Sequence, residues 1–191
     1  MHDKESPKVV NNSDLFRPHL KRAKNILLGE TRPHWFVQLT FYFDFLLSTI
    51  FLLWNAISLF ILLFPDYLRI HKGVDVQAII ELRGRTLGFQ EDVFHHNLLL
   101  FFSIASGSWL LALIALPFIW RQQLIAVYVR GFLLVTYVVT MFVLLGSSYF
   151  LEDTTNFDKY SLLTLTVLLL ILYFQLKKRK SITQPFVETD H

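Results

Sequence analysis

Residues 40–64 read TFYFDFLLSTIFLLWNAISLFILLF, and this stretch decides the fold. It contains one ionisable side chain, Asp44, and one side-chain amide, Asn55. A largely apolar run of roughly 20 residues is long enough to cross the ~30 Å hydrocarbon core of a bilayer as a helix. A helix also makes its backbone hydrogen bonds within the segment, which the membrane interior requires. The stretch therefore predicts a transmembrane helix.

Three further apolar runs follow, and the composition is typical of a membrane protein. Hydrophobic residues make up 53% of the chain and charged residues only 17%, whereas soluble domains carry about 25% charged residues. We predict an all-α integral membrane protein with a four-transmembrane-helix bundle over residues 36–176. The expected spans are residues 36–64, 97–120, 124–151 and 160–176.

The connector at residues 65–96 is polar and long for a segment without structure of its own. Apolar residues at helical spacing within residues 76–87 predict a short helix, although Gly84 and Gly88 weaken this prediction. Pro117, near the end of the second span, is expected to kink or end that helix.

The segment before the first span is polar at first and then basic. Residues 1–13 are aperiodic and polar, which predicts a disordered tail. Residues 14–35 favour either a basic amphipathic interfacial helix on an anionic leaflet or a solvated connector packed on the bundle. In the first interpretation, which the predicted fold includes, Lys21, Arg22 and Lys24 contact lipid headgroups.

Basic residues gather on one side of the predicted topology. The N-terminal segment, the second loop and the tail at residues 177–191 are basic, whereas the first and third loops are balanced or acidic. Lysine and arginine near the ends of spans favour the cytosol, so both termini are predicted to be cytosolic. Four residues of the tail are further candidate headgroup contacts: Lys177, Lys178, Arg179 and Lys180.

Two opposite charges, Asp44 and Arg130, lie at similar depths from the predicted cytosolic ends of the first and third spans. A charge in hydrocarbon costs about 2.5–3.5 kcal/mol on insertion scales, so each needs a partner or water. An interhelical ion pair is the favoured interpretation. A proton, ion or headgroup site, and snorkelling to the interface, are the alternatives. Asn55 is expected to hydrogen-bond to a neighbouring helix, and it completes a candidate intramembrane polar network with Asp44 and Arg130.

The sequence offers little for catalysis. It contains no cysteine, which excludes disulfide and thiol chemistry. It also lacks GxSxG, P-loop and GxGxxG patterns, so we predict no enzyme activity, no catalytic residue and no cofactor. His95 and His96 follow Glu91 and Asp92, but without an HExxH or i, i+4 histidine pair no metal site is predicted. No nucleic-acid partner is predicted.

Two short motifs carry a family resemblance. LKRAKNILLGE at residues 20–30 precedes the first span, and FPDYL at residues 64–68 ends it. With four spans and a basic KKRK exit, this order resembles the tumour protein p53-inducible protein 11-like family, in which LK…K.IL..GE and FPD.L stand in comparable places. The loop after FPD is longer here. The resemblance implies a non-enzymatic protein of the endoplasmic reticulum membrane that acts through partners.

The leading hypothesis is an accessory or scaffold subunit of a larger endomembrane complex, with membrane lipids and other integral membrane proteins as partners. The alternative is a small transporter or lipid-handling protein with a polar site at Asp44, Asn55 and Arg130. An integral-membrane enzyme acting on lipids is the least favoured hypothesis.

Overall fold

The computed structural model describes residue 25, residues 32–90 and residues 93–183. Its described chain is helical, with six helices and no strand in these ranges. The expected tail at residues 1–13 and most of the expected interfacial segment at residues 14–35 lie outside the described residues, and the candidate headgroup contacts Lys21, Arg22 and Lys24 lie there too.

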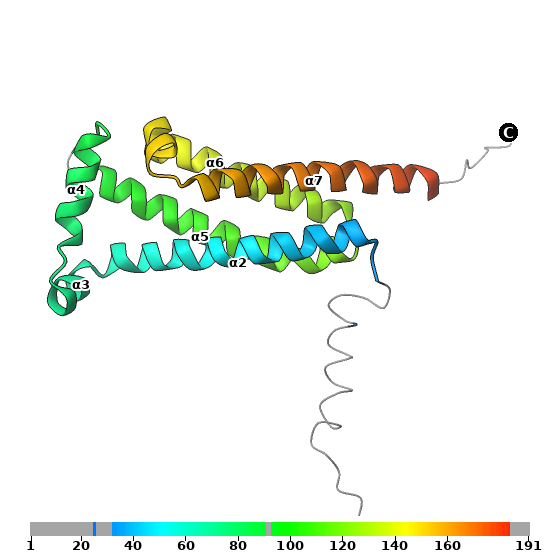
Figure 1. Ribbon diagram of the computed structural model, residues 1–191, viewed down its shortest axis with the longest axis horizontal. Coiled ribbons are helices and arrows are strands. Elements are labelled where there is room, and N and C mark those ends of the chain that lie inside the picture. Colours follow the sequence, from blue (N-terminus) through cyan, green and yellow to red (C-terminus); the bar gives the residue numbers. More distant parts are fainter. Residues whose placement is uncertain (1–24, 26–31, 91–92, 184–191) are drawn as a thin grey trace, which may run out of the picture.

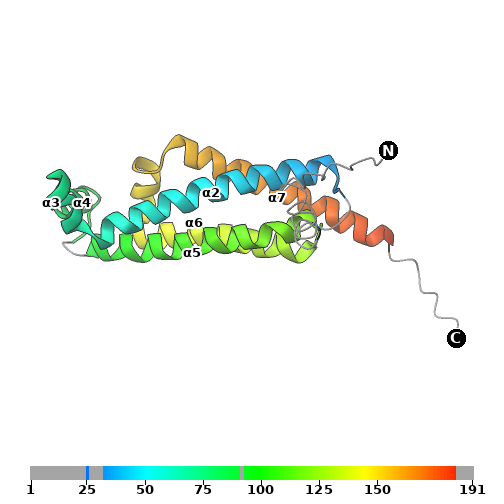
Figure 2. The same ribbon diagram turned by 90° about the horizontal axis from the view of Figure 1, so that it is seen from below.

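Four long helices run alongside one another and two short helices lie across one end of them (Figures 1 and 2). The long helices are α2 (Trp35–Leu63), α5 (Val93–Trp120), α6 (Leu124–Glu152) and α7 (Asn156–Thr183). By length and composition, all four are able to cross a membrane. The chain is therefore an all-α, multi-pass integral membrane protein.

Two of the helices begin several residues before the predicted membrane spans. Helix α5 begins at Val93 rather than at residue 97, and α7 begins at Asn156 rather than at residue 160. The apolar pattern marks only what can lie in hydrocarbon, whereas backbone hydrogen bonding continues into the polar flanks. Pro117 does not end α5, which continues to Trp120.

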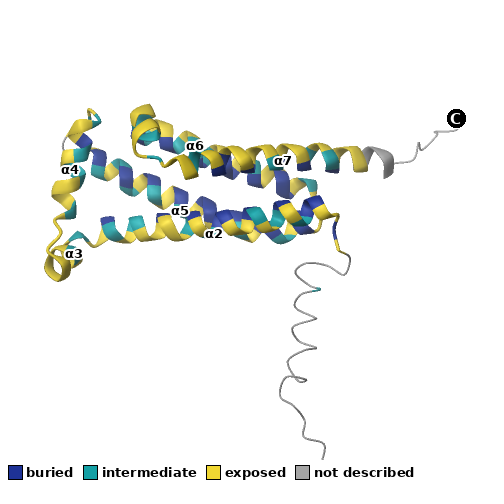
Figure 3. Ribbon diagram, in the orientation of Figure 1, coloured by how far each residue is buried: buried dark blue, intermediate teal, exposed yellow. Residues whose placement is uncertain are grey.

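Helix α5 is the central element of the bundle, because it packs along both α2 and α6. Small buried side chains on α5, such as Ala105 and Ala112, allow the neighbouring helices to approach closely. Helix α7 makes fewer contacts with α6 and α2. The buried residues accordingly line the inner faces of the long helices, and the outer faces are exposed (Figure 3).

The connector forms α3 (Pro65–Lys72) and α4 (Val76–Thr86). Gly84, which weakened the prediction of a helix here, is buried, and a Cβ at this position would lie 2.8 Å from Phe94 Cβ. The glycine is therefore what lets α4 approach the start of α5. The preceding residue, Arg83, joins α4 to the end of α6 by ion pairs with Glu152 at 3.0 Å and Asp153 at 2.8 Å. The hydrogen bond with Asp153 raises the pKa of the Arg83 guanidinium.

Helix α6 contains a break that the sequence did not predict. Gly146 has φ 78° and ψ 171°, a conformation that is essentially restricted to glycine. Such a break frees backbone carbonyls of the preceding turn. Asn97 on α5 donates from Nδ2 to the carbonyl oxygen of Leu144 at 2.8 Å, so a neighbouring helix satisfies one acceptor beside the break.

Candidate functional site

The two charges within the long helices meet in the buried interior of the bundle, nearer the end at which α2 and α6 begin. Arg130 Nε on α6 donates to both carboxylate oxygens of Asp44 on α2 at 2.9 Å, and Nη2 donates to Asp44 Oδ1 at 2.8 Å. The Arg130 and Asp44 side chains are 1% and 0% exposed. This geometry is a bidentate ion pair in a buried environment, where the mutual attraction acts against the large cost of removing both charges from water.

Two further side chains enclose this pair. Ser48 Oγ donates to Asp44 Oδ1 at 3.0 Å, and Arg130 Nη2 lies 3.3 Å from Ser48 Oγ as a second donor. The Arg130 guanidinium carbon lies 4.7 Å from the centroid of the Trp109 ring, which places a cation over an aromatic face on α5. Asp44, Ser48, Trp109 and Arg130 are called the ion-pair cluster below.

The ion-pair cluster joins three of the four long helices. Trp109 also stacks on Phe51 of α2, with ring centroids 4.6 Å apart and an interplanar angle of 6°. The sequence predicted a pair between Asp44 and Arg130, but it did not predict that Ser48 and Trp109 contact this pair. Ser48 was recognisable as the i+4 neighbour of Asp44 on a helix. Nothing in the local sequence marks Trp109, whose place depends on how α5 packs.

Asn55 lies apart from the ion-pair cluster. It lies 11 positions after Asp44 on the same helix, about 16 Å further along at 1.5 Å per residue. Its Nδ2 donates to the carbonyl oxygen of Phe51 at 2.6 Å, within its own helix. Its Oδ1 is buried and has no hydrogen-bond partner in the part of the chain that the structure describes. The structure thus splits the predicted polar network into the ion-pair cluster and a separate amide.

Asn55 lines a cavity of about 430 Å³ between α2, α5, α6 and the start of α7. We call it the Asn55 cavity. Its wall is aromatic and aliphatic in the deep part, and residues of the α6–α7 turn line one end. The lining includes Phe51, Trp54, Phe101, Phe102, Tyr137, Met141, Tyr149, Asp153, Thr155, Phe157 and Asp158.

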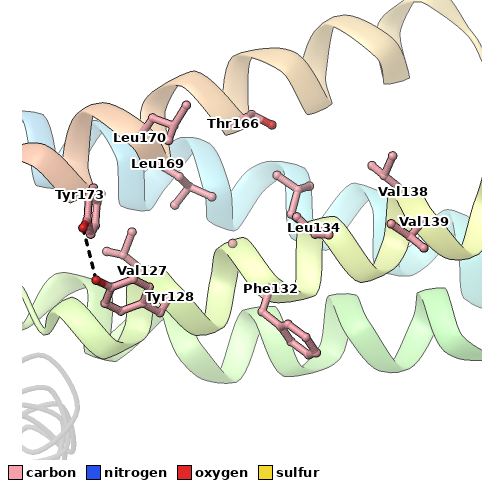
Figure 4. A pocket seen from close by; sticks show the side chains of 12 residues that line it. Val127, Tyr128, Phe132, Leu134, Val138, Val139, Thr166, Leu169, Leu170 and Tyr173 are labelled. Carbon is pink, nitrogen blue, oxygen red and sulfur yellow. Dashed lines mark hydrogen bonds between the residues drawn. The ribbon is translucent and has the colours of Figure 1, made fainter.

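A second hollow, the α6–α7 groove, has a volume of about 530 Å³. Its lining is almost wholly aliphatic and aromatic, and its polar groups are the hydroxyls of Tyr128, Thr166 and Tyr173 (Figure 4). Tyr128 of α6 donates to the Tyr173 hydroxyl of α7 at 3.4 Å and closes one end. The Thr166 hydroxyl donates to the Leu162 carbonyl of its own helix at 2.7 Å, so all three hydroxyls are engaged and the groove offers mainly apolar contact.

The basic run that ends α7 is partly described. Lys177 Nζ lies 5.7 Å from the centroid of the Tyr173 ring, and Arg179 Nη1 donates to Gln122 Oε1 at 2.6 Å. Lys178 is exposed, and nothing is described of the Lys180 side chain. These residues lie at the end of the bundle that carries the α5–α6 turn (Figure 1). Among the described residues, no three histidine, aspartate or glutamate side chains are grouped to hold a metal.

The described residues define a multi-pass membrane protein of four long helices, with a buried ion pair and a largely apolar cavity that Asn55 lines. No protein-family model, curated protein or solved structure matches the chain.

Proposed function

We propose that this protein is a non-enzymatic accessory or scaffold subunit of a larger membrane assembly, with both termini in the cytosol. The ion-pair cluster is the observation that carries the proposal. The charges of Asp44 and Arg130 are paired with each other, and Ser48 and Trp109 contact the pair. The membrane-embedded charges are thus used to hold α2, α5 and α6 together, which suits a rigid binding unit better than a transport site that must load and release a ligand.

Two surfaces support action through partners in the membrane. The outer face of α2 presents large aromatic side chains, including Tyr42 at 59% and Trp54 at 66% exposure, to lipid or to partner helices. The basic residues before α2 and at the end of α7 are proposed to contact acidic lipid headgroups. The resemblance carried by residues 20–30 and 64–68 supports placement in the endoplasmic reticulum membrane.

Affinity capture of the full chain in mild detergent, followed by native mass measurement, tests the accessory role. We expect a defined integral membrane partner at a fixed ratio. The double variant Asp44→Asn/Arg130→Gln is the matched control, since it removes both charges without leaving one unpaired. It should retain the partner if the charges serve only the bundle. A strictly monomeric particle, with no membrane protein recovered above an unrelated four-span control, contradicts the proposal.

A second candidate function is lipid handling. The Asn55 cavity is the specific observation that favours it. Asn55, whose amide oxygen has no hydrogen-bond partner among the described residues, lines a volume within the range of small-molecule sites. Asp44 and Arg130 do not line this cavity. In this candidate, Asn55 alone of the three polar residues contacts the bound molecule, and the ion-pair cluster acts as the frame.

A further inference from the structure

We propose that the Asn55 cavity binds a lipid alcohol, an amphiphile whose hydroxyl donates a hydrogen bond to Asn55 Oδ1 and whose apolar body fills the aromatic wall. This inference rests on the second candidate function, lipid handling, and names the chemical class of its ligand. It does not depend on the accessory role.

The hydrogen bonding of the Asn55 amide indicates which polar group the ligand should carry. The residue is 1% exposed, and its Nδ2 donates to the Phe51 carbonyl at 2.6 Å. Its Oδ1 has two lone pairs and no partner among the described residues. A buried acceptor without a donor is costly, and more so in a membrane interior where bulk water does not compensate. The cavity therefore favours a molecule that brings a donor to this oxygen.

The apolar body of the ligand is set by the wall around Asn55. Phe101 and Phe102 contribute rings from α5, and Tyr137 and Met141 contribute from α6. Tyr137 lies beside the Asn55 amide and packs its ring against Phe101 at a centroid distance of 5.5 Å. Rings and a thioether make close contacts with hydrocarbon. The Asn55 amide and the Tyr137 hydroxyl beside it are the polar groups of this part of the wall.

The ligand has a route from the lipid-facing side. Trp54 and Ile57 line the cavity and are also 66% and 54% exposed on α2. Phe157, at the start of α7, lines it as well and is 55% exposed. Residues that belong both to the wall and to the outer surface mark an opening, which here lies between α2 and the start of α7.

The carboxylates at the end of the cavity argue for a neutral ligand. Asp153 is paired with Arg83 at 2.8 Å. Asp158 accepts from the backbone N–H of Thr155 at 3.2 Å and from its hydroxyl at 2.8 Å, in a reciprocal cap of α7. An anion would meet these carboxylates at close range. A cation would have to compete with Arg83 for Asp153 or with the Thr155 cap for Asp158, and would have only a neutral amide as its partner near Phe51. A hydroxyl needs neither exchange.

Matched pairs of probes test the need for a donor. The full chain in nanodiscs is titrated with cholesterol and cholesteryl methyl ether, and separately with hexadecan-1-ol and its methyl ether, so that a ring-bearing source is distinguished from a straight-chain one. Each ether keeps the apolar body and lacks the donor. We expect at least one alcohol to bind roughly five- to tenfold more tightly than its ether, the effect of one net hydrogen bond.

Two variants assign the preference to the amide. Asn55→Leu removes the acceptor at similar volume, and we expect it to bind an alcohol and its ether equally well. Thr49→Val is the matched control, because Thr49 lies on the same helix, donates to its own Phe45 carbonyl and does not line the cavity. It should keep the wild-type preference.

Each outcome decides. An equal affinity of the wild type for alcohol and ether overturns the donor requirement and leaves lipid handling in place, with water as the partner of Asn55. A preference that persists in Asn55→Leu overturns the assignment to Asn55. Failure of the wild type to bind either probe pair overturns both the inference and the second candidate function. Because the wild-type comparison needs no variant, the test stands even if Asn55→Leu does not fold.

Discussion

At the level of single residues, the ion pair between Asp44 and Arg130 joins α2 to α6 inside the bundle. Neither charge is exposed to solvent, and among the described residues each is the charged partner of the other. Removing one side chain leaves the other charge buried, which is far worse than removing both. The contribution of the pair is therefore best measured by comparing single with double substitutions.

We predict that Asp44→Asn and Arg130→Gln each lower the free energy of unfolding by about 3–5 kcal/mol, because each leaves an uncompensated buried charge. The double variant should lose less than the sum of the two, with a coupling of about 0.5–3 kcal/mol. Reversible unfolding in mixed micelles measures all four proteins. Additive losses would show that the two side chains act independently and would contradict the ion-pair geometry.

The sequence predicts this pair because charges in apolar runs are rare and costly, and because the two residues sit at matching depths. It did not separate Asn55 from them, since the pattern shows polarity but not which groups pack together. It also placed Asn97 merely at the edge of a span. The role of Asn97 depends on the Leu144 carbonyl of another helix, at 2.8 Å, and only tertiary packing brings the two together.

At the level of elements, the break in α6 is the main departure from a regular helix. An isolated glycine inside an apolar helical run is ordinarily tolerated as helix, so the break at Gly146 could not be predicted from the sequence. The structure pairs the break with a donor from α5. The last turn of α6 then reaches Arg83 of α4 through Glu152 and Asp153.

We predict that Gly146→Ala lowers the free energy of unfolding by about 1–3 kcal/mol, because φ 78° with ψ 171° is strained for any residue with a Cβ. A Cβ there meets nothing within 4 Å, so the loss would come from the backbone alone. Gly131→Ala is the matched control on the same helix, and its Cβ also meets nothing within 4 Å. Since Gly131 is helical, alanine should be neutral or stabilising by up to about 1 kcal/mol. Equal effects at both sites would mean that α6 is continuous.

At the scale of the whole molecule, the two ends of the bundle differ in what they carry. One end has α3, α4 and the α6–α7 turn, joined through Arg83. The other has the α5–α6 turn, tied to the last turns of α7 by the bond from Arg179 to Gln122 (Figure 1). The number and order of the long helices followed from hydropathy alone. The loose attachment of α7, and the cavity beside it, did not, because both arise from how side chains of separate helices fill space.

The absence of cysteine from the sequence allows a direct test of the proposed orientation. Gln77→Cys on α4, Gln123→Cys in the α5–α6 turn and Asn156→Cys at the start of α7 each place one thiol at an exposed position. With both termini cytosolic and four spans, the charge distribution predicts that Gln123 lies on the cytosolic side and the other two on the opposite side.

In sealed microsomes, a membrane-impermeant maleimide should label Gln123→Cys at once, and should label Gln77→Cys and Asn156→Cys only after detergent is added. The reverse pattern would invert the orientation. Different behaviour of Gln77→Cys and Asn156→Cys would contradict the four-span topology itself, because the structure joins α4 to the end of α6 through Arg83 at a single end of the bundle.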